Sequence, residues 1–176
     1  VGDPCWSTID LAEVRRESWS SDKRDMLRHG DPDGRDWCPA MADAPLRNHE
    51  WFWEPDDEHK LYSVEQLVQM YFQSVGRNST LILGATPDRR GLVPDADFGR
   101  MKAMGRAVSA ALGQSVASTA DLDRPGQDRS AAGPTITLDM PPPHAFDVII
   151  LQEDIRHGER VRKYVIETHA TDGSWQ

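Results

Sequence analysis

Apolar and polar positions follow their clearest pattern between residues 63 and 112. Ser63 and Gln66 form the sequence of a capping box, which predicts a helix starting there, and Gly76 predicts its end. Residues 79–84 are a short apolar run typical of a strand buried on both faces, and a second helix is predicted over 94–112. This order of elements predicts an α/β layer structure. The residues at helical spacing are Val64, Leu67, Val68, Tyr71 and Val75, then Phe98, Met101, Gly105, Val108 and Leu112.

The flanking regions follow different patterns. Residues 1–60 are rich in Gly, Pro, Asp and Trp, so we expect them to be mostly irregular, with a short helix over 10–18. Residues 113–134 show no periodicity and indicate a connector. Alternating or β-rich segments come next and predict short strands of an antiparallel sandwich. These segments are 135–140, 145–151 and 160–168.

Both ends of the chain are typical of a piece of a larger protein. The first residues, Val1 to Pro4, contain neither an initiator Met nor a signal-peptide pattern. Asp172 and Gly173 form a strong hairpin-turn pair, but too few residues follow for a returning strand. We therefore expect an internal segment, with a natural chain whose ends are frayed as the alternative.

Composition excludes some partners. The chain has 176 residues and a formal net charge of −9, which argues against nucleic acid as a partner because binding it requires a basic surface. The same charge disfavours an anionic membrane surface, and no apolar run approaches the roughly 18 residues that span a bilayer. The oligomeric state stays open.

Residues 37–53 contain the richest candidate chemistry. Five of the six tryptophans lie before residue 54, and this segment combines three of them with Asp and Arg side chains. Aromatic faces can stack on sugar rings while polar groups bind hydroxyls, as in a ligand cleft. The alternative, which spacing alone favours, is that Trp37, Trp51 and Phe52 pack a loop onto the core.

Other clusters have simpler explanations. Cys5, Cys38, His29 and His49 match no zinc module; one disulfide is possible, and unpaired buried thiols are the preferred interpretation. The acidic turn at 31–36 lacks the glutamate of a calcium loop and is interpreted as solvated. The acidic run around Pro55, formed by Glu54, Asp56, Asp57 and Glu58, is also interpreted as a solvated face.

Taken together, the motifs of this chain resemble the C-terminal part of glycoside hydrolase family 29, the α-L-fucosidases. The resemblance is specific in order and spacing over residues 2–112. It is weaker beyond residue 140, where two segments are similar to the β-sandwich that follows the catalytic barrel of the family. The motifs are 2–10, 37–53, 74–78, 81–88 and 91–94, with 146–153 and 158–161 in the weaker part.

The resemblance implies an α/β fold, namely the C-terminal portion of a (β/α)8 TIM-like barrel followed by a partial antiparallel β-sandwich. Residues 1–114 would form the last part of the barrel and residues 115–133 a linker. Residues 134–176 would form the incomplete sandwich domain.

The resemblance also implies a function. A retaining exo-α-L-fucosidase removes terminal fucose from glycans by double displacement, using a nucleophile and a general acid/base. In the family the nucleophilic Asp precedes the motif at 2–10, and in the subfamily that this chain resembles most the acid/base Glu precedes it as well, so this chain would hold no catalytic residue and would be inactive alone. The implied partner is a fucosylated glycan, with no cofactor and no metal, and the implied location is extracellular or periplasmic. The alternative is a non-catalytic carbohydrate-binding or structural module.

Met41 departs from the family pattern, which has a glutamate there. A thioether cannot replace a carboxylate in binding hydroxyls, so Met41 supports the non-catalytic alternative. Asp43 and Arg47 match the pattern and are candidates for polar contacts with the sugar, or for an ion pair with each other inside the loop. The candidate substrate-binding residues are Trp6, Asp43, Arg47, Trp51 and Trp53.

Overall fold

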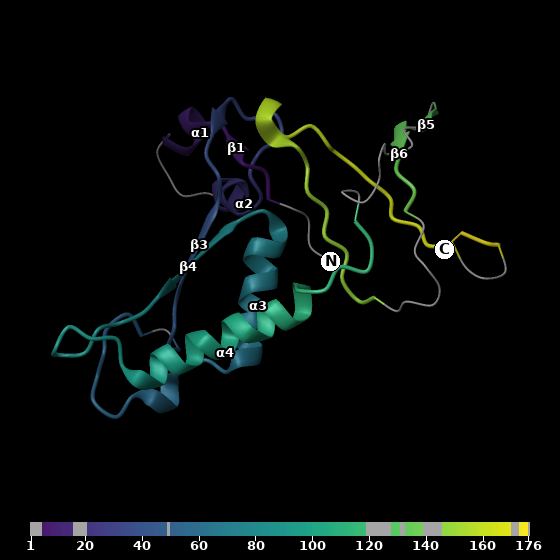
Figure 1. Ribbon diagram of the computed structural model, residues 1–176. Helices are drawn as coiled ribbons and strands as arrows, with labels where there is room; N and C mark the ends of the chain where they lie inside the picture. Colours follow the sequence, from purple (N-terminus) through teal and green to yellow (C-terminus); the bar gives the residue numbers. More distant parts are fainter. Residues whose placement is uncertain are drawn as a thin grey trace.

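The computed structural model describes residues 5–15, 21–48, 50–118, 128–130, 133–138, 146–169 and 173–175 (Figure 1). Within them the chain mixes helices with short strands. The strands are β1 (Thr8–Ile9), β2 (Asp36–Trp37), β3 (Met41–Pro45), β4 (Thr80–Gly84), β5 (Asp128–Ser130) and β6 (Gly133–Thr135). The helices are α1 (Leu11–Arg15), α2 (Ser21–His29), α3 (Val64–Ser74) and α4 (Asp95–Leu112), with 3-10 turns at Glu58–Lys60, Val75–Arg77 and Ile155–His157.

The centre of the fold is a parallel pair of strands joined by a helix. β3 and β4 pair in parallel from Met41↔Thr80 to Pro45↔Gly84, and α3 connects them. Both α3 and α4 lie on the same side of this pair (Figure 1). The prediction that β4 is buried on both faces is wrong, because alternate residues such as Ile82 are exposed on the face that no helix covers. A parallel pair with a helical crossover confirms the α/β character predicted from the sequence.

The two long helices follow the sequence pattern closely. The capping box at α3 is confirmed, since the Ser63 hydroxyl accepts from the Gln66 backbone N–H and the Gln66 side chain accepts from the Ser63 N–H. Helix α3 ends at Ser74, and a 3-10 turn carries the chain past Gly76. Asn78, with φ 64°, takes the left-handed position that Gly76 was predicted to occupy. Asn tolerates this conformation better than other residues with side chains, apart from Asp.

The N-terminal region is more helical than expected. Helix α1 confirms part of the helix predicted over 10–18, of which residues 16–18 lie outside the described residues. Helix α2 was not predicted, because it is strongly polar and its two apolar residues, Met26 and Leu27, are too few to show a helical repeat. Its signals are an acidic first turn, a basic last turn and Gly30 after its end. Gly30 has φ 66°, and a Cβ there would lie 2.2 Å from the Trp6 carbonyl oxygen.

The strands predicted for the C-terminal sandwich are wrong where the structure describes them. Residues 146–151 and 160–168 contain no strand, and 136–138 extend β6 no further. A strand needs a hydrogen-bonded neighbour and a covering layer, whereas the apolar side chains here are exposed. β5 pairs with β6, and His169 forms an isolated bridge with Trp175. Residues 139–145, Asp172 and most of the predicted linker lie outside the described residues.

No helix in the described part of the chain has the length and apolar character needed to cross a membrane.

Candidate functional site

The candidate site lies where β3 and β4 end. In parallel α/β structures the carboxyl ends of neighbouring strands meet at one edge, and ligand sites gather there. Here β3 continues into a loop at residues 46–62, and β4 continues into a second loop at 85–94. The start of α4 lies at the same end of the strand pair, whereas β1, α1 and α2 lie at the other end (Figure 1).

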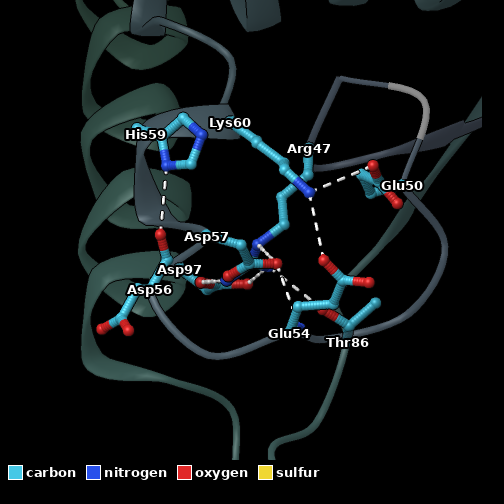
Figure 2. A network of polar contacts seen from close by, with 9 residues as sticks. All are labelled: Arg47, Glu50, Glu54, Asp56, Asp57, His59, Lys60, Thr86 and Asp97. Atoms are coloured by element: carbon cyan, nitrogen blue, oxygen red, sulfur yellow. Dashed lines mark hydrogen bonds and ion pairs between the residues drawn. The ribbon is translucent and has the colours of Figure 1, made fainter.

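A buried arginine organises this edge (Figure 2). Arg47 donates from Nη2 to Asp97 Oδ1 at 2.7 Å and from Nη1 to Thr86 Oγ1 at 3.0 Å, and Nη1 also donates to Asp97 Oδ2. Its Nε lies 3.0 Å from Asp57 Oδ2, as an ion-pair contact without hydrogen-bond alignment. The side chains of Arg47, Asp57 and Asp97 are 1%, 2% and 0% exposed. We call Arg47, Asp57, Thr86 and Asp97 the arginine cluster.

The electrostatics of the arginine cluster keep Arg47 charged. Burial alone lowers the pKa of a guanidinium, but the hydrogen bonds and charge of Asp97, together with Asp57, outweigh burial and raise the pKa of Arg47 above its ordinary value. Asp57 Oδ2 also accepts from the Glu54 backbone N–H at 3.2 Å, while its Oδ1 has no hydrogen-bond partner among the described residues. A bidentate pair with Asp97 holds the guanidinium in one plane.

The loop at 46–62 is closed at its base by the backbone. The Asn48 N–H donates to the Lys60 carbonyl at 2.9 Å, and the Tyr62 N–H donates to the Leu46 carbonyl at 3.1 Å. On the outside of the loop, Lys60 Nζ lies 3.2 Å from Glu50 and 3.3 Å from Glu54 (Figure 2). Glu50 and Lys60 border a polar hollow of about 500 Å³. Its lining residues are Asn48, Glu50, His59, Lys60, Leu61, Tyr62 and Gln66.

Four of the five predicted binding residues lie on β3 or on the loop that follows it. The Trp51 ring packs over Gly84 at the end of β4, 3.5 Å from the position a Cβ would take there. Trp53 is half-buried on the same loop, and Asp43 is exposed on the same face of β3 as Met41. Arg47 lies deeper, and its ion pairs are with Asp57 and Asp97. The predicted pairing of Asp43 with Arg47 is therefore replaced by a different set of partners.

Trp6 lies apart from the other four. The Cys5 N–H donates to the carbonyl of Arg77, which precedes β4, and the Cys38 N–H, just before β3, donates to the Ser7 carbonyl. Trp6 is therefore held at the amino ends of the two strands, with the Arg162 guanidinium 5.2 Å from its ring centre. The structure does not bring Trp6 together with Trp51.

The alternative interpretation of the aromatic side chains is wrong for two of the three residues within the described chain. Trp37 and Phe52 are 52% and 82% exposed and do not pack a loop onto the core, whereas Trp51, 48% exposed, packs one part of its ring over Gly84. Cys5 is buried and Cys38 exposed, and neither forms a disulfide. No group of three possible metal ligands occurs among the described residues, and His49 lies outside them.

Asp57 and Asp97 are the residues that sequence reasoning missed. Asp57 is part of the acidic run predicted to be solvated, yet it is among the most buried side chains of the described chain. The interpretation failed because a run of like charges does not show which member turns inward. Asp97 lies in the first turn of α4, where an acidic residue is favourable at any surface helix. The available signal was Arg47 itself, which follows an apolar strand and needs a counterion if buried.

A parallel strand–helix–strand unit with a polar edge at the carboxyl ends is characteristic of α/β enzymes. No family model matches the chain. Alpha-L-fucosidase 1 of Arabidopsis thaliana is 24% identical to it, and a protein of Oryza sativa subsp. japonica with the same name, given provisionally, is 29% identical. Both alignments cover the whole chain, which spans 38% of the length of each relative.

Comparison with solved structures also finds similarity to fucosidases. A Bacteroides thetaiotaomicron protein provisionally named an α-L-fucosidase is 42% identical with a TM-score of 0.83, over 100% of this chain and 38% of that one. SpGH29 is 29% identical with a TM-score of 0.58, over 66% of this chain and 25% of that one. A Ruminococcus gnavus GH29 fucosidase in complex with fucose is 27% identical with a TM-score of 0.51, over 65% and 22%. The comparisons confirm the predicted relationship of this chain to family 29 α-L-fucosidases.

Proposed function

We propose that this chain is part of a retaining exo-α-L-fucosidase that releases terminal fucose from glycans by double displacement. The observation that carries the proposal is the similarity to fucosidases along the whole chain, at 42% identity and a TM-score of 0.83 for one structure. The nucleophile and the general acid/base would come from parts of the enzyme beyond these 176 residues, so the chain alone would be inactive. An extracellular or periplasmic location is part of the same proposal.

In this proposal β3, α3, β4 and α4 are the last elements of a (β/α)8 barrel. The carboxyl ends of barrel strands carry the substrate, and the exposed face of β3 and β4 would line the barrel interior. Trp51 and Trp53 would form an apolar wall for the sugar ring, and Asp43 would bind a hydroxyl. Arg47 fits less well as a direct contact, because its nitrogens already face two carboxylates and a hydroxyl.

The first test is hydrolysis of 4-nitrophenyl α-L-fucoside by the full-length protein. Turnover is expected, and a folded protein without turnover would overturn the proposal.

Replacing Asp43 by Ala tests its proposed role in the same protein. Because the Asp43 side chain is exposed on β3, we expect fucoside turnover to fall by at least tenfold with little change in the unfolding midpoint. Steady-state kinetics measure the first effect and urea denaturation the second. Unchanged kinetics would remove Asp43 from the pocket.

The alternative, a non-catalytic carbohydrate-binding module, is favoured by Met41. This side chain is exposed on the same face of β3 as Asp43, where the family pattern has a carboxylate. Calorimetric binding of L-fucose without turnover would support the alternative. In that case Met41→Glu should strengthen binding, while Met41→Gln, which has a similar shape but no charge, serves as the matched control and should strengthen it less.

A further inference from the structure

The loop at 46–62 carries both tryptophans of the proposed sugar wall, so its position decides where they stand. Backbone hydrogen bonds close the base of this loop, and the Leu46 N–H donates to the Gly84 carbonyl at the end of β4. The contacts that the loop makes with the segment after β4 and with α4 involve the side chains of Arg47 and Arg100. Arg47 makes most of them, and it joins two other segments, through Thr86 and Asp97, to Asp57 of the loop itself.

Each partner of Arg47 lies on a different segment at the carboxyl ends of β3 and β4. Asp97 comes from the first turn of α4, Thr86 follows β4, and Asp57 lies on the far side of the loop itself (Figure 2). The guanidinium therefore links the end of β3 to three segments through planar, directional contacts. A buried network of this kind specifies one arrangement more strongly than apolar packing does, because a misplaced charge there has no partner.

We propose that Asp57 and Asp97 are positioning residues, which act through Arg47 to fix the loop at 46–62 and thereby hold Trp51 and Trp53 against the sugar. The inference rests on the proposed function for the sugar, but the placement of the tryptophans is a property of the fold alone. The Trp51 ring packs against Gly84 at the end of β4, and rotation of the loop would move the ring away from Gly84.

The experiment uses the full-length protein labelled with 5-fluorotryptophan and observed by 19F NMR. Trp51→Phe and Trp53→Phe assign the two signals. Asp97→Asn keeps the shape of the side chain and removes its charge. We expect the Trp51 and Trp53 signals to shift or broaden, while the Trp6 signal at the other end of the strands stays in place. Asp10→Asn is the matched control, because its partner Arg35 is exposed.

Kinetics on 4-nitrophenyl α-L-fucoside supply the second measurement. Loss of a positioned binding wall should lower kcat/KM by about 100-fold, mostly through KM, because misplacement by about 1 Å has effects of this size. Asp97→Glu restores the charge and should recover part of the activity. Thr86→Val removes one hydrogen bond from Arg47 and should shift the same two 19F signals by a smaller amount. This variant replaces Asp97→Asn in the experiment if Asp97→Asn does not fold.

Unchanged Trp51 and Trp53 signals in a folded Asp97→Asn or Thr86→Val protein would overturn the inference. If both signals move but the wild-type protein has no turnover, the positioning role stands and the proposed fucosidase activity fails. The two claims are thus tested separately.

Discussion

Two polar clusters hold opposite ends of the β3–β4 pair, and they differ in how they are built. At the carboxyl ends, the arginine cluster joins charged groups that are almost completely buried. At the amino ends, Glu159 accepts from the Ser7 N–H at 2.8 Å, the Ser7 hydroxyl at 2.7 Å and the Asn78 side-chain amide at 2.6 Å. We call Glu159, Ser7 and Asn78 the Glu159 cluster.

The difference lies in what each cluster connects. The arginine cluster links segments of one α/β unit, where removing one charge would leave another buried without a partner. The Glu159 cluster links that unit to residues 146–169, a segment with no strand and with exposed apolar side chains. A single half-buried carboxylate with neutral donors can supply this link, because water can hydrogen-bond to the carboxylate and to its donors when they separate. The arginine cluster therefore connects segments within the α/β unit, whereas the Glu159 cluster attaches residues 146–169 to that unit.

Breaking the arginine cluster should have the largest effect on stability. Arg47→Ala leaves Asp57 and Asp97 buried without a cation, so we expect the free energy of unfolding to fall by about 3–5 kcal/mol in the full-length protein. Lys60→Ala is the control, since its pairs with Glu50 and Glu54 are partly exposed and should contribute at most about 1 kcal/mol. Urea denaturation measures both. Equal losses in the two variants would contradict the comparison.

Breaking the Glu159 cluster should have a smaller and more local effect. Glu159→Gln removes the negative charge of the carboxylate whose oxygens accept three hydrogen bonds. We expect the free energy of unfolding to fall by about 1–2 kcal/mol. Residues 146–169 should become more sensitive to limited proteolysis while fucoside turnover stays close to that of the wild type. A large loss of turnover with unchanged proteolysis would show that this link acts on the site instead.

The Cys5 thiol reports on the Glu159 cluster without unfolding the protein. Burial, and to a lesser degree the charge of Glu159, raises the pKa of Cys5, so little thiolate forms near pH 8 and alkylation should be slow. Glu159→Gln should lower that pKa and move the pH profile of Cys5 alkylation toward lower pH. Mass spectrometry of iodoacetamide-treated protein follows Cys5 and the exposed Cys38 in the same sample. A profile that does not move would exclude Glu159 as a cause.

The smallest effect is expected in the loop that follows β4. Arg90, as the main cause, and backbone N–H groups of Leu92 and Arg90 hold the pKa of Asp88 below its ordinary value of 3.8. A lowered folded pKa means that the contribution of Asp88 to stability is present above pH 3.8 and is lost as the pH falls through the folded pKa. Carboxyl 13C NMR titration should show this low pKa, and Arg90→Ala should raise it. A pKa unchanged by Arg90→Ala would contradict this account.

Local sequence signals predicted the parts of the fold that local chemistry controls. The capping box at Ser63, the apolar run at 79–84 and the periodicity before Leu112 each became the expected element, because caps and periodicity act within a few residues. Helix α2 was missed because it is strongly polar and Met26 and Leu27 are its apolar residues, too few to show a helical repeat in the sequence. The predicted sandwich strands at 146–151 and 160–168 show the opposite case, because their sequence pattern is present but no strand pairs with them among the described residues.

The chain positions of the candidate residues could be predicted, but their role in binding stays a prediction. The similarity to fucosidases extends over the whole chain, and Asp43 lies on β3 while Trp51 and Trp53 lie on the loop that follows it. Trp6 was grouped with them because the motifs follow one another in the chain. The strand direction separates them, since a residue before β3 and β4 and a residue after them stand at opposite ends of the pair.

The amino-acid sequence by itself determined the α/β character, the ends of the two long helices α3 and α4 to within a few residues and the relationship to fucosidases, because these depend on local patterns and on residue order. Only the tertiary structure decided which charges are buried. Asp57 and Asp97 are 10 and 50 positions from Arg47, and nothing local marks either as its partner. A buried charge is tolerated only where distant segments supply its counterion, and packing alone brings those segments together.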